Sequence, residues 1–153
     1  MHYFLDSSAL IKRYIIEVGT HWIRSITARS SGHVVIIAHI TPVEILSGTM
    51  RRRREGAINP RTARAARLLI DRHTSREYRV VGLTGQVVQH AEDLLELHAL
   101  RAYDAVQLAS ALESNNRLIA AGLSPLIFVS ADSRLLIAAT SEGLMIDDPS
   151  SHP

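Results

Sequence analysis

The sequence predicts a three-layer α/β/α fold, in which helices cover both faces of a mostly parallel sheet of four or five strands. Short apolar runs alternate with longer segments of helical periodicity along the 153-residue chain. The run at residues 34–37 (VVII) is continuous and β-branched, which is typical of a parallel strand buried on both faces. Gly32, Gly56 and Gly143 stand where three of the predicted helices end.

Length and composition indicate one domain with a buried core. We expect residues 1–147 to form that domain and residues 148–153 to form a flexible tail. No long uncharged apolar run predicts a membrane span, and Asp6 interrupts the only apolar segment that could begin a signal peptide. The chain has no cysteine, which excludes disulfides and thiolate metal sites. We therefore expect a cytoplasmic protein without a membrane partner.

The first half of the chain predicts three strands, at residues 3–5, 34–37 and 78–81. A helix capped by Ser7 or Ser8 is predicted to follow the first strand, and a second helix covers residues 20–30. Thr41 at the N-cap, Pro42 at the first position and Glu44 at the third predict the start of the next helix. A further helix is predicted to begin at residues 59–60 (NP).

The second half predicts helices at residues 84–97 and 103–112, the latter nearly all apolar and therefore buried. A fourth strand is predicted at residues 126–129, followed by a helix that begins near residue 133. Residues 144–146 predict a last, short strand. This alternation of strands and helices is typical of βαβ units.

Positive charge is concentrated in one segment, although the net charge of the chain is only +2. Residues 51–79 carry ten arginines against three acids, a net charge of +7, and the other residues carry a net charge of −5. Such asymmetry indicates a polyanionic partner. The run from Arg51 to Arg54 fits a solvated helix end, a contact with RNA phosphates or a surface for an acidic protein.

Four acids stand directly after predicted strands or in the first turn of predicted helices. They are Asp6, Glu44, Asp104 and Asp132. In a parallel sheet these positions meet at one edge, where ligands bind in open α/β folds. Carboxylates gathered there would repel one another by roughly 4 kcal/mol per close pair, so they would need protons or a cation. Oxygen ligands alone select a hard ion, Mg²⁺ or Mn²⁺.

Each acid also has a purely structural interpretation. Glu44 could complete a capping box with Thr41, and Asp104 could interact favourably with the dipole of its helix. Asp132 could cap the helix that follows it. Asp6 is the hardest to explain in this way, because two serines that could cap the first helix follow it.

Four segments of the sequence resemble the PIN-domain nucleases, and most of all the VapC-type toxins of prokaryotic type II toxin–antitoxin pairs. These segments are residues 4–10 (FLDSSAL), 41–44 (TPVE), 100–109 (LRAYDAVQLA) and 128–132 (FVSAD). The first and third are specific, the second is weak by itself, and the resemblance extends from residue 3 to about residue 146.

The resemblance implies an endoribonuclease that depends on Mg²⁺ or Mn²⁺, with Asp6, Glu44, Asp104 and Asp132 as the catalytic and metal-binding acids. Ser130 matches the family's hydroxyl position beside the last acid. The family often has a further acid here, but Ala131 and Ser133 flank Asp132, so a second metal site is left open. A cognate VapB-like antitoxin and a homodimer are the other partners that the resemblance implies.

Ser7 and Arg101 are supporting candidates. The Ser7 hydroxyl could assist the acids or cap the helix, and Arg101 could contact substrate or neutralise the acids. Catalysis through an aspartyl phosphate on Asp6 is disfavoured, because Ser8 occupies the place of the second acid and Lys12 is the only lysine. A PIN-like module that binds RNA or protein without cleaving it is the remaining alternative.

Overall fold

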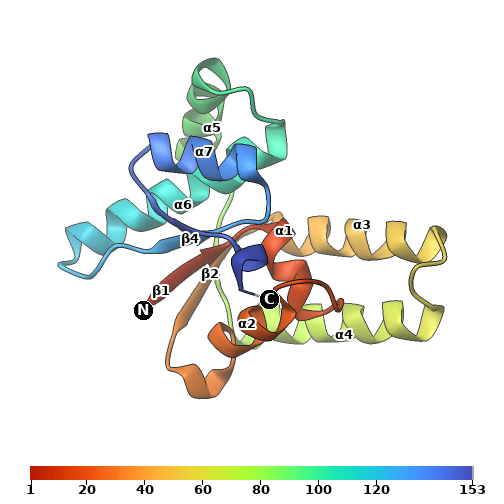
Figure 1. Cartoon of the computed structure of the whole chain (residues 1–153). Helices are drawn as coiled ribbons and strands as arrows, with labels where there is room; N and C mark the ends of the chain where they lie inside the picture. Colours follow the sequence, from red (N-terminus) through yellow and green to blue (C-terminus); the bar gives the residue numbers. More distant parts are fainter. Residues whose placement is uncertain (153) are drawn as a thin grey trace.

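The computed structural model describes residues 1–152, and Pro153 lies outside the described part. Within it, five parallel strands form one sheet in the order β3-β2-β1-β4-β5 (Figure 1). The strands are β1 (His2–Leu5), β2 (Val34–Ala38), β3 (Arg79–Val81), β4 (Ile127–Val129) and β5 (Met145–Asp147). The predicted three-layer fold is thereby confirmed, with five strands.

Helices cover both faces of the sheet (Figure 1). On one side lie α1 (Ser7–Leu10), the 3₁₀ helix η1 (Ile11–Arg13), α2 (Thr20–Ile26), α3 (Thr41–Arg54) and α4 (Pro60–Arg76). On the other lie α5 (Gly85–Leu97), α6 (Ala102–Ala120) and α7 (Ser133–Ser141). The short 3₁₀ helices η2 (Arg29–Ser31) and η3 (Pro149–Ser151) complete the elements.

Alternation along the strands creates two cores. Phe4 and Phe128, both fully buried, face α5, α6 and α7, whereas Leu5 and Ile37 face the helices of the other layer. The two phenylalanines are register partners on β1 and β4, with ring centroids 5.8 Å apart. Core packing thus holds β1 and β4 side by side, close to the strand ends that the predicted acids follow.

The parallel sheet brings the carboxyl ends of its strands to one edge. The chain adds β2 and β3 on one side of β1 and then returns to place β4 on the other side. This reversal beside β1 is a topological switch point, where a crevice opens in α/β folds. Asp6 follows β1 at this point, and Asp132 follows β4.

Several helix boundaries differ from prediction. Asp6, not Ser7 or Ser8, caps α1, because its side chain accepts a hydrogen bond from the Ala9 N–H. The second helix ends at Ile26 rather than residue 30, whereas α6 extends to Ala120. At residue 28 the backbone is extended and interrupts the helix.

The predicted tail packs against the domain. η3 lies within it, and the His152 ring stacks on Trp22 with centroids 4.1 Å apart. His152 Nε2 also lies 2.8 Å from Asp147 Oδ1. The flexibility of residues 148–153 stays a prediction. Among residues 1–152, no helix combines the length and apolar character needed to cross a bilayer.

Candidate active site

Asp6 sits at the centre of a buried hydrogen-bond network directly after β1. Asp6 is only 3% exposed. Oδ1 accepts hydrogen bonds from the Ala9 N–H and the Ser8 hydroxyl, both at 2.8 Å. Oδ2 accepts from the Ser130 hydroxyl at 2.8 Å and from Ser8 at 2.9 Å. Burial with these donors fixes the carboxyl group at the switch point of the sheet.

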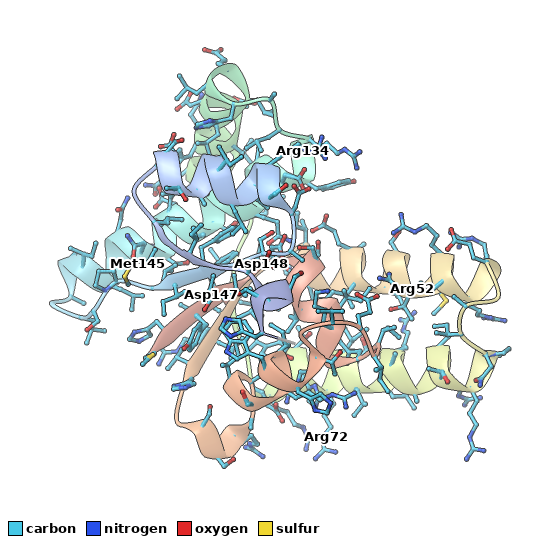
Figure 2. All side chains as sticks on the ribbon, viewed as in Figure 1. Arg52, Arg72, Arg134, Met145, Asp147 and Asp148 are labelled. Carbon is cyan, nitrogen blue, oxygen red and sulfur yellow. The ribbon has the colours of Figure 1, made fainter. Side chains whose placement is uncertain are left out.

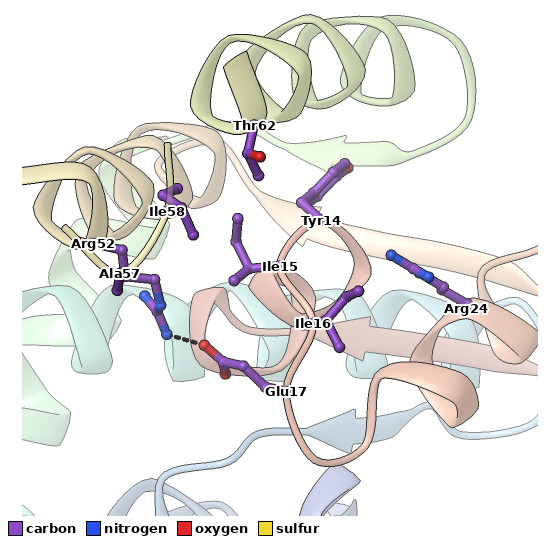
Figure 3. Close-up of a pocket in the computed structure, with 9 residues that line it drawn as sticks. All are labelled: Tyr14, Ile15, Ile16, Glu17, Arg24, Arg52, Ala57, Ile58 and Thr62. Carbon is purple, nitrogen blue, oxygen red and sulfur yellow. Dashed lines mark hydrogen bonds and ion pairs between the residues drawn. The ribbon is translucent and has the colours of Figure 1, made fainter. Parts of the chain in front are cut away.

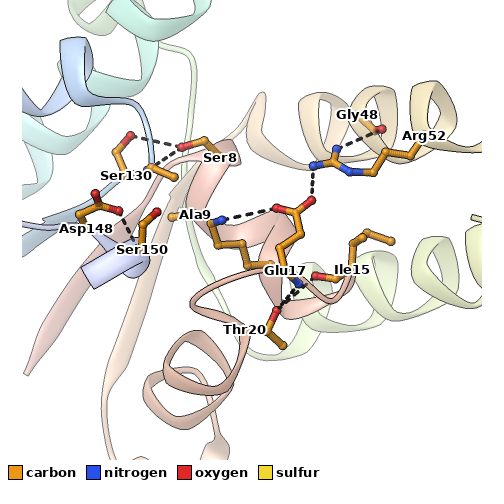
Figure 4. Close-up of polar contacts among 12 residues, drawn as sticks. Ser8, Ala9, Ile15, Glu17, Thr20, Gly48, Arg52, Ser130, Asp148 and Ser150 are labelled. Atoms are coloured by element: carbon orange, nitrogen blue, oxygen red, sulfur yellow. Dashed lines mark hydrogen bonds and ion pairs between the residues drawn. The ribbon is translucent and has the colours of Figure 1, made fainter. Parts of the chain in front are cut away.

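The two serine hydroxyls join β1 to the segment after β4. Ser8 Oγ accepts a hydrogen bond from the Ala131 N–H at 2.8 Å, and Ser130 Oγ accepts one from the Asp132 N–H at 3.0 Å. The two hydroxyl oxygens are 3.3 Å apart, and Figure 4 shows Ser8 and Ser130 facing each other across the strand ends. This bridge positions the loop that carries Asp132 relative to Asp6.

Glu44 lies in the first turn of α3, but it does not complete the predicted capping box. The N-cap is Ile40, without a side-chain cap bond, and Thr41 is already helical. Instead, Gln107 Nε2 of α6 donates to Glu44 Oε2 at 2.6 Å and to Thr41 Oγ1 at 3.0 Å. The nearby Ser7 hydroxyl also lowers the pKa of Glu44. The Glu44 carboxylate is therefore held toward the site rather than used by its own helix.

Asp104 and Asp132 lie at the starts of α6 and α7. The nearby Arg101 backbone N–H lowers the pKa of Asp104. Asp132 caps α7 by accepting a hydrogen bond from the Arg134 N–H at 2.9 Å, which confirms its interpretation as a helix cap. The Arg134 guanidinium lies 3.6 Å from Asp132 Oδ2 and borders the site (Figure 2).

Burial and mutual repulsion raise the pKa values of three of these acids. Burial, opposed by hydrogen bonds from Ala9, Ser8 and Ser130 and reinforced by the charge of Glu44, raises the pKa of Asp6 to about 7. Burial also raises the pKa of Glu44, with a further contribution from Asp104.

The pKa of Asp104 is likewise raised by burial and then by the negative charge of Asp132, while the charges of Arg101 and Arg134 lower it. Arg101 is exposed, and its positive charge partly offsets the negative charge around Asp104. Electrostatic repulsion thus links the four acids in series, Asp6 with Glu44, Glu44 with Asp104 and Asp104 with Asp132, although they come from distant parts of the sequence. We call them the acidic quartet.

The acidic quartet is electrostatically connected, but it is not a preformed metal cage. Within residues 1–152, no three His, Asp or Glu side chains converge closely enough to hold a metal ion. The available donors are all carboxylate and hydroxyl oxygens, which suit Mg²⁺ or Mn²⁺. Their raised pKa values also fit a cation, because a positive charge would relieve both the burial cost and the repulsion.

A cavity of about 480 Å³ lies away from the acidic quartet, between the η1–α2 loop and the hairpin of α3 and α4 (Figure 3). Its lining residues are Tyr14, Ile15, Ile16, Glu17, Arg24, Arg52, Ala57, Ile58 and Thr62. It contains no member of the acidic quartet, and its one carboxylate, Glu17, is ion-paired with Arg52. The cavity therefore lacks the carboxylate pair or cluster that hydrolytic chemistry requires.

Sequence reasoning singled out Ser7 and Ser130, and the structure places both against members of the acidic quartet. It missed the roles of Ser8 and Gln107. Gln107 is 1% exposed among the mostly apolar residues 105–112 of α6, and its position three residues after Asp104 was the available signal. No comparable signal distinguished Ser8 from an ordinary helix cap.

Comparisons with known proteins agree with this geometry. The sequence matches the PIN domain family over residues 3–135. No curated protein matches the chain. Among solved structures, PAE2754 from Pyrobaculum aerophilum is 20% identical, with a TM-score of 0.61 over 99% of this chain and 92% of the other.

Two further structures show the same fold. VapC20 of Mycobacterium tuberculosis, described as a sarcin-ricin loop cleaving toxin, is 18% identical with a TM-score of 0.62, covering 94% of this chain and 96% of its own. FitAcB from Neisseria gonorrhoeae is 15% identical with a TM-score of 0.62, covering 97% and 98%. The family match covers most of the sequence, including three members of the acidic quartet at strand ends or helix starts and Glu44 in α3. The chain therefore belongs to the PIN domain family.

Proposed function

We propose that the protein is a Mg²⁺- or Mn²⁺-dependent endoribonuclease that hydrolyses RNA phosphodiester bonds and acts in the cytoplasm as the toxin of a toxin–antitoxin pair. The observation that carries this proposal is the acidic quartet at the switch point of a PIN domain, in which the carboxyl pKa values of Asp6, Glu44 and Asp104 are raised. Buried acids that repel one another are unfavourable for folding, and their retention fits a site that binds a cation.

In this proposal Asp6, Asp104 and Asp132 hold the divalent ion. When bound, the ion supplies an activated water nucleophile and stabilises negative charge that develops on the phosphate. Glu44 binds the ion through water or orients the attacking water, and Gln107 holds Glu44 in position with a hydrogen bond of 2.6 Å. The hydroxyls of Ser8 and Ser130 keep the Asp6 carboxyl group in place, where it would help to hold the ion.

The partners follow from the structural neighbours by analogy. VapBC2 from Rickettsia felis, 11% identical with a TM-score of 0.61, is a VapBC pair that was solved with a promoter DNA fragment. We propose by this analogy that the chain pairs with a VapB-like antitoxin and forms a homodimer. Co-expression with the product of a neighbouring small gene would test antitoxin binding. Light scattering would then measure whether the protein is a homodimer.

The nuclease proposal is tested by titrating Mn²⁺ into the purified protein with a structured RNA. We expect cleavage to rise with Mn²⁺ and to stop on addition of EDTA. Mg²⁺ in place of Mn²⁺ should support part of this cleavage. RNA that remains whole at saturating Mn²⁺, although the protein binds it, would favour the non-catalytic module instead. A calorimetric titration without RNA records metal binding independently of cleavage.

Replacing Gln107 by leucine is expected to weaken metal binding without removing any acid of the quartet. The Gln107 hydrogen bond lowers the pKa of Glu44, so its loss leaves Glu44 more readily protonated and less firmly held. Loss of a partner that orients a ligand typically costs about 10–100-fold in metal affinity or activity. The measurement is the Mn²⁺ concentration at half-maximal cleavage.

Ser114→Ala on the same helix is the control, because Ser114 bonds only to the carbonyl of Ser110, away from the quartet. An unchanged Mn²⁺ requirement in folded Gln107→Leu protein would show that Gln107 has no positioning role.

A further inference from the structure

Two arginines lie on the same face of α3 as Glu44, farther along the helix. At about 100° per residue, Arg51 is about 20° from Glu44 around the axis, and Arg54 and Ser47 are about 60–80° away. The rise of about 1.5 Å per residue places Arg51 about 10 Å and Arg54 about 15 Å beyond Glu44. Ser47, Arg51 and Arg54 are all exposed, so they form a continuous polar ridge that starts at the acidic quartet.

These guanidinium groups are free to bind a ligand. Among residues 1–152, neither Arg51 nor Arg54 takes part in an ion pair or a side-chain hydrogen bond, whereas Arg52 between them is paired with Glu17 and bonded to the Gly48 carbonyl (Figures 2 and 4). Arg52 therefore has a structural role, whereas Arg51 and Arg54 do not.

The ridge lies on a projecting, strongly basic hairpin. α3 and α4 extend together beyond the rest of the molecule (Figure 1). From residue 51 to residue 64 the hairpin has six arginines and one acid, Glu55. Arg61 and Arg64, exposed on α4, add to the positive charge near its tip. A surface of this kind attracts polyanions, and guanidinium forks match phosphate oxygens.

We propose that this ridge is an extended RNA-binding track, on which Arg51 and Arg54 bind phosphates of the strand that enters the acidic quartet. The proposal rests on the nuclease function and adds to it the path of the substrate. RNA is favoured over an acidic protein because the basic ridge is continuous with the proposed site of hydrolysis. Phosphates two or more nucleotides from the scissile bond would then contribute to binding without taking part in the chemistry.

The test measures RNA binding with cleavage switched off. In EDTA, fluorescence anisotropy with a labelled single-stranded RNA of about 20 nucleotides compares Arg51→Gln/Arg54→Gln with Arg53→Gln/Arg72→Gln. The control removes the same charge, but Arg53 lies about 180° from Glu44 around α3 and Arg72 lies on α4. Arg72 points away from α3 (Figure 2). Circular dichroism checks that both variants fold.

We expect the track variant to bind about three- to tenfold more weakly than the control. The slope of log affinity against log salt should fall by about 1.4, because each lost single-strand phosphate contact contributes about 0.7. Equal affinities and equal slopes for the two variants would overturn the proposal. Loss of binding to a co-purified antitoxin with RNA binding unchanged would likewise overturn it, in favour of a protein-binding surface.

Cleavage with Mn²⁺ separates this proposal from the nuclease function. A dinucleotide has only the scissile phosphate and cannot reach Arg51 or Arg54, about 10 Å and 15 Å beyond Glu44. Wild type and track variant should therefore cleave it equally, whereas the 20-nucleotide RNA should be cleaved more slowly by the variant at subsaturating concentration. If wild-type protein cleaves neither RNA, the nuclease proposal fails, and the binding comparison still decides whether the track exists.

Discussion

Replacing Asp6 by asparagine is expected to abolish RNA cleavage and, in EDTA, to make the protein more stable at neutral pH. The amide keeps the shape of the carboxyl group, and the hydroxyls of Ser8 and Ser130 can each reverse a hydrogen bond to accept from it. The substitution removes the charge that would hold the cation. We expect cleavage to fall by at least about a hundredfold, since such an ion contributes several kcal/mol.

The gain in stability follows from the raised pKa of Asp6. A rise from 3.8 to about 7 means that between these pH values the folded protein binds more protons than the unfolded chain. The free energy of unfolding of the wild type therefore falls as pH rises through this window, by at most about 4 kcal/mol. Asparagine does not ionise, so the variant escapes this loss.

Urea unfolding at about pH 4 and about pH 8 measures the effect. The two proteins should differ little at the lower pH, and the variant should be more stable at the higher one. Added Mn²⁺ should stabilise the wild type but not the variant. Cleavage at the wild-type rate by folded, pure variant would refute the role of Asp6, and lower stability of the variant at both pH values would refute the electrostatic account.

Replacing Phe128 by alanine is expected to destabilise the protein by about 3–5 kcal/mol. Phe128 is fully buried and stacks with Phe4 at 5.8 Å, so the substitution leaves a cavity between the sheet and helices α5, α6 and α7. Most domains have only about 5–15 kcal/mol of stability in total. The variant should therefore unfold at much lower urea concentration, with an unchanged dependence of the free energy on urea.

Ile137→Ala on α7 is the matched control. Ile137 is 67% exposed, so removal of its side chain should change stability by less than about 0.5 kcal/mol. Similar losses in the two variants would show that the contact between β1 and β4 is not a principal part of the core.

Most of the architecture was predictable because each strand has its own local pattern. The β-branched run of β2 and the apolar start of β1 are recognisable without tertiary information. Helix ends were less predictable. Thr41, Pro42 and Glu44 fit a capping box, but Gln107 competes for both Thr41 and Glu44. Only the approach of the start of α6 to the start of α3 at the edge of the sheet could show that the box would not form.

The acids were found from their places after strands and at helix starts, and the structure links them through repulsion. Their geometry was not predictable. Asp6 turned out to combine a cap with a buried network, a combination that depends on Ser130, 124 residues away. Whether the quartet holds one divalent ion remains a prediction, which the Mn²⁺ titration described above addresses.

The placement of β1 between β2 and β4 has a consequence during synthesis. When the first hundred residues have left the ribosome, β1 can pair with β2, but its other edge stays open until β4 is made. The bond between Ser130 and Asp6 forms only after residue 130 has also left the ribosome. A nascent chain that ends before β4 therefore lacks the network that holds Asp6 in place, and the proposed site assembles only after residues 127–132 have been synthesised.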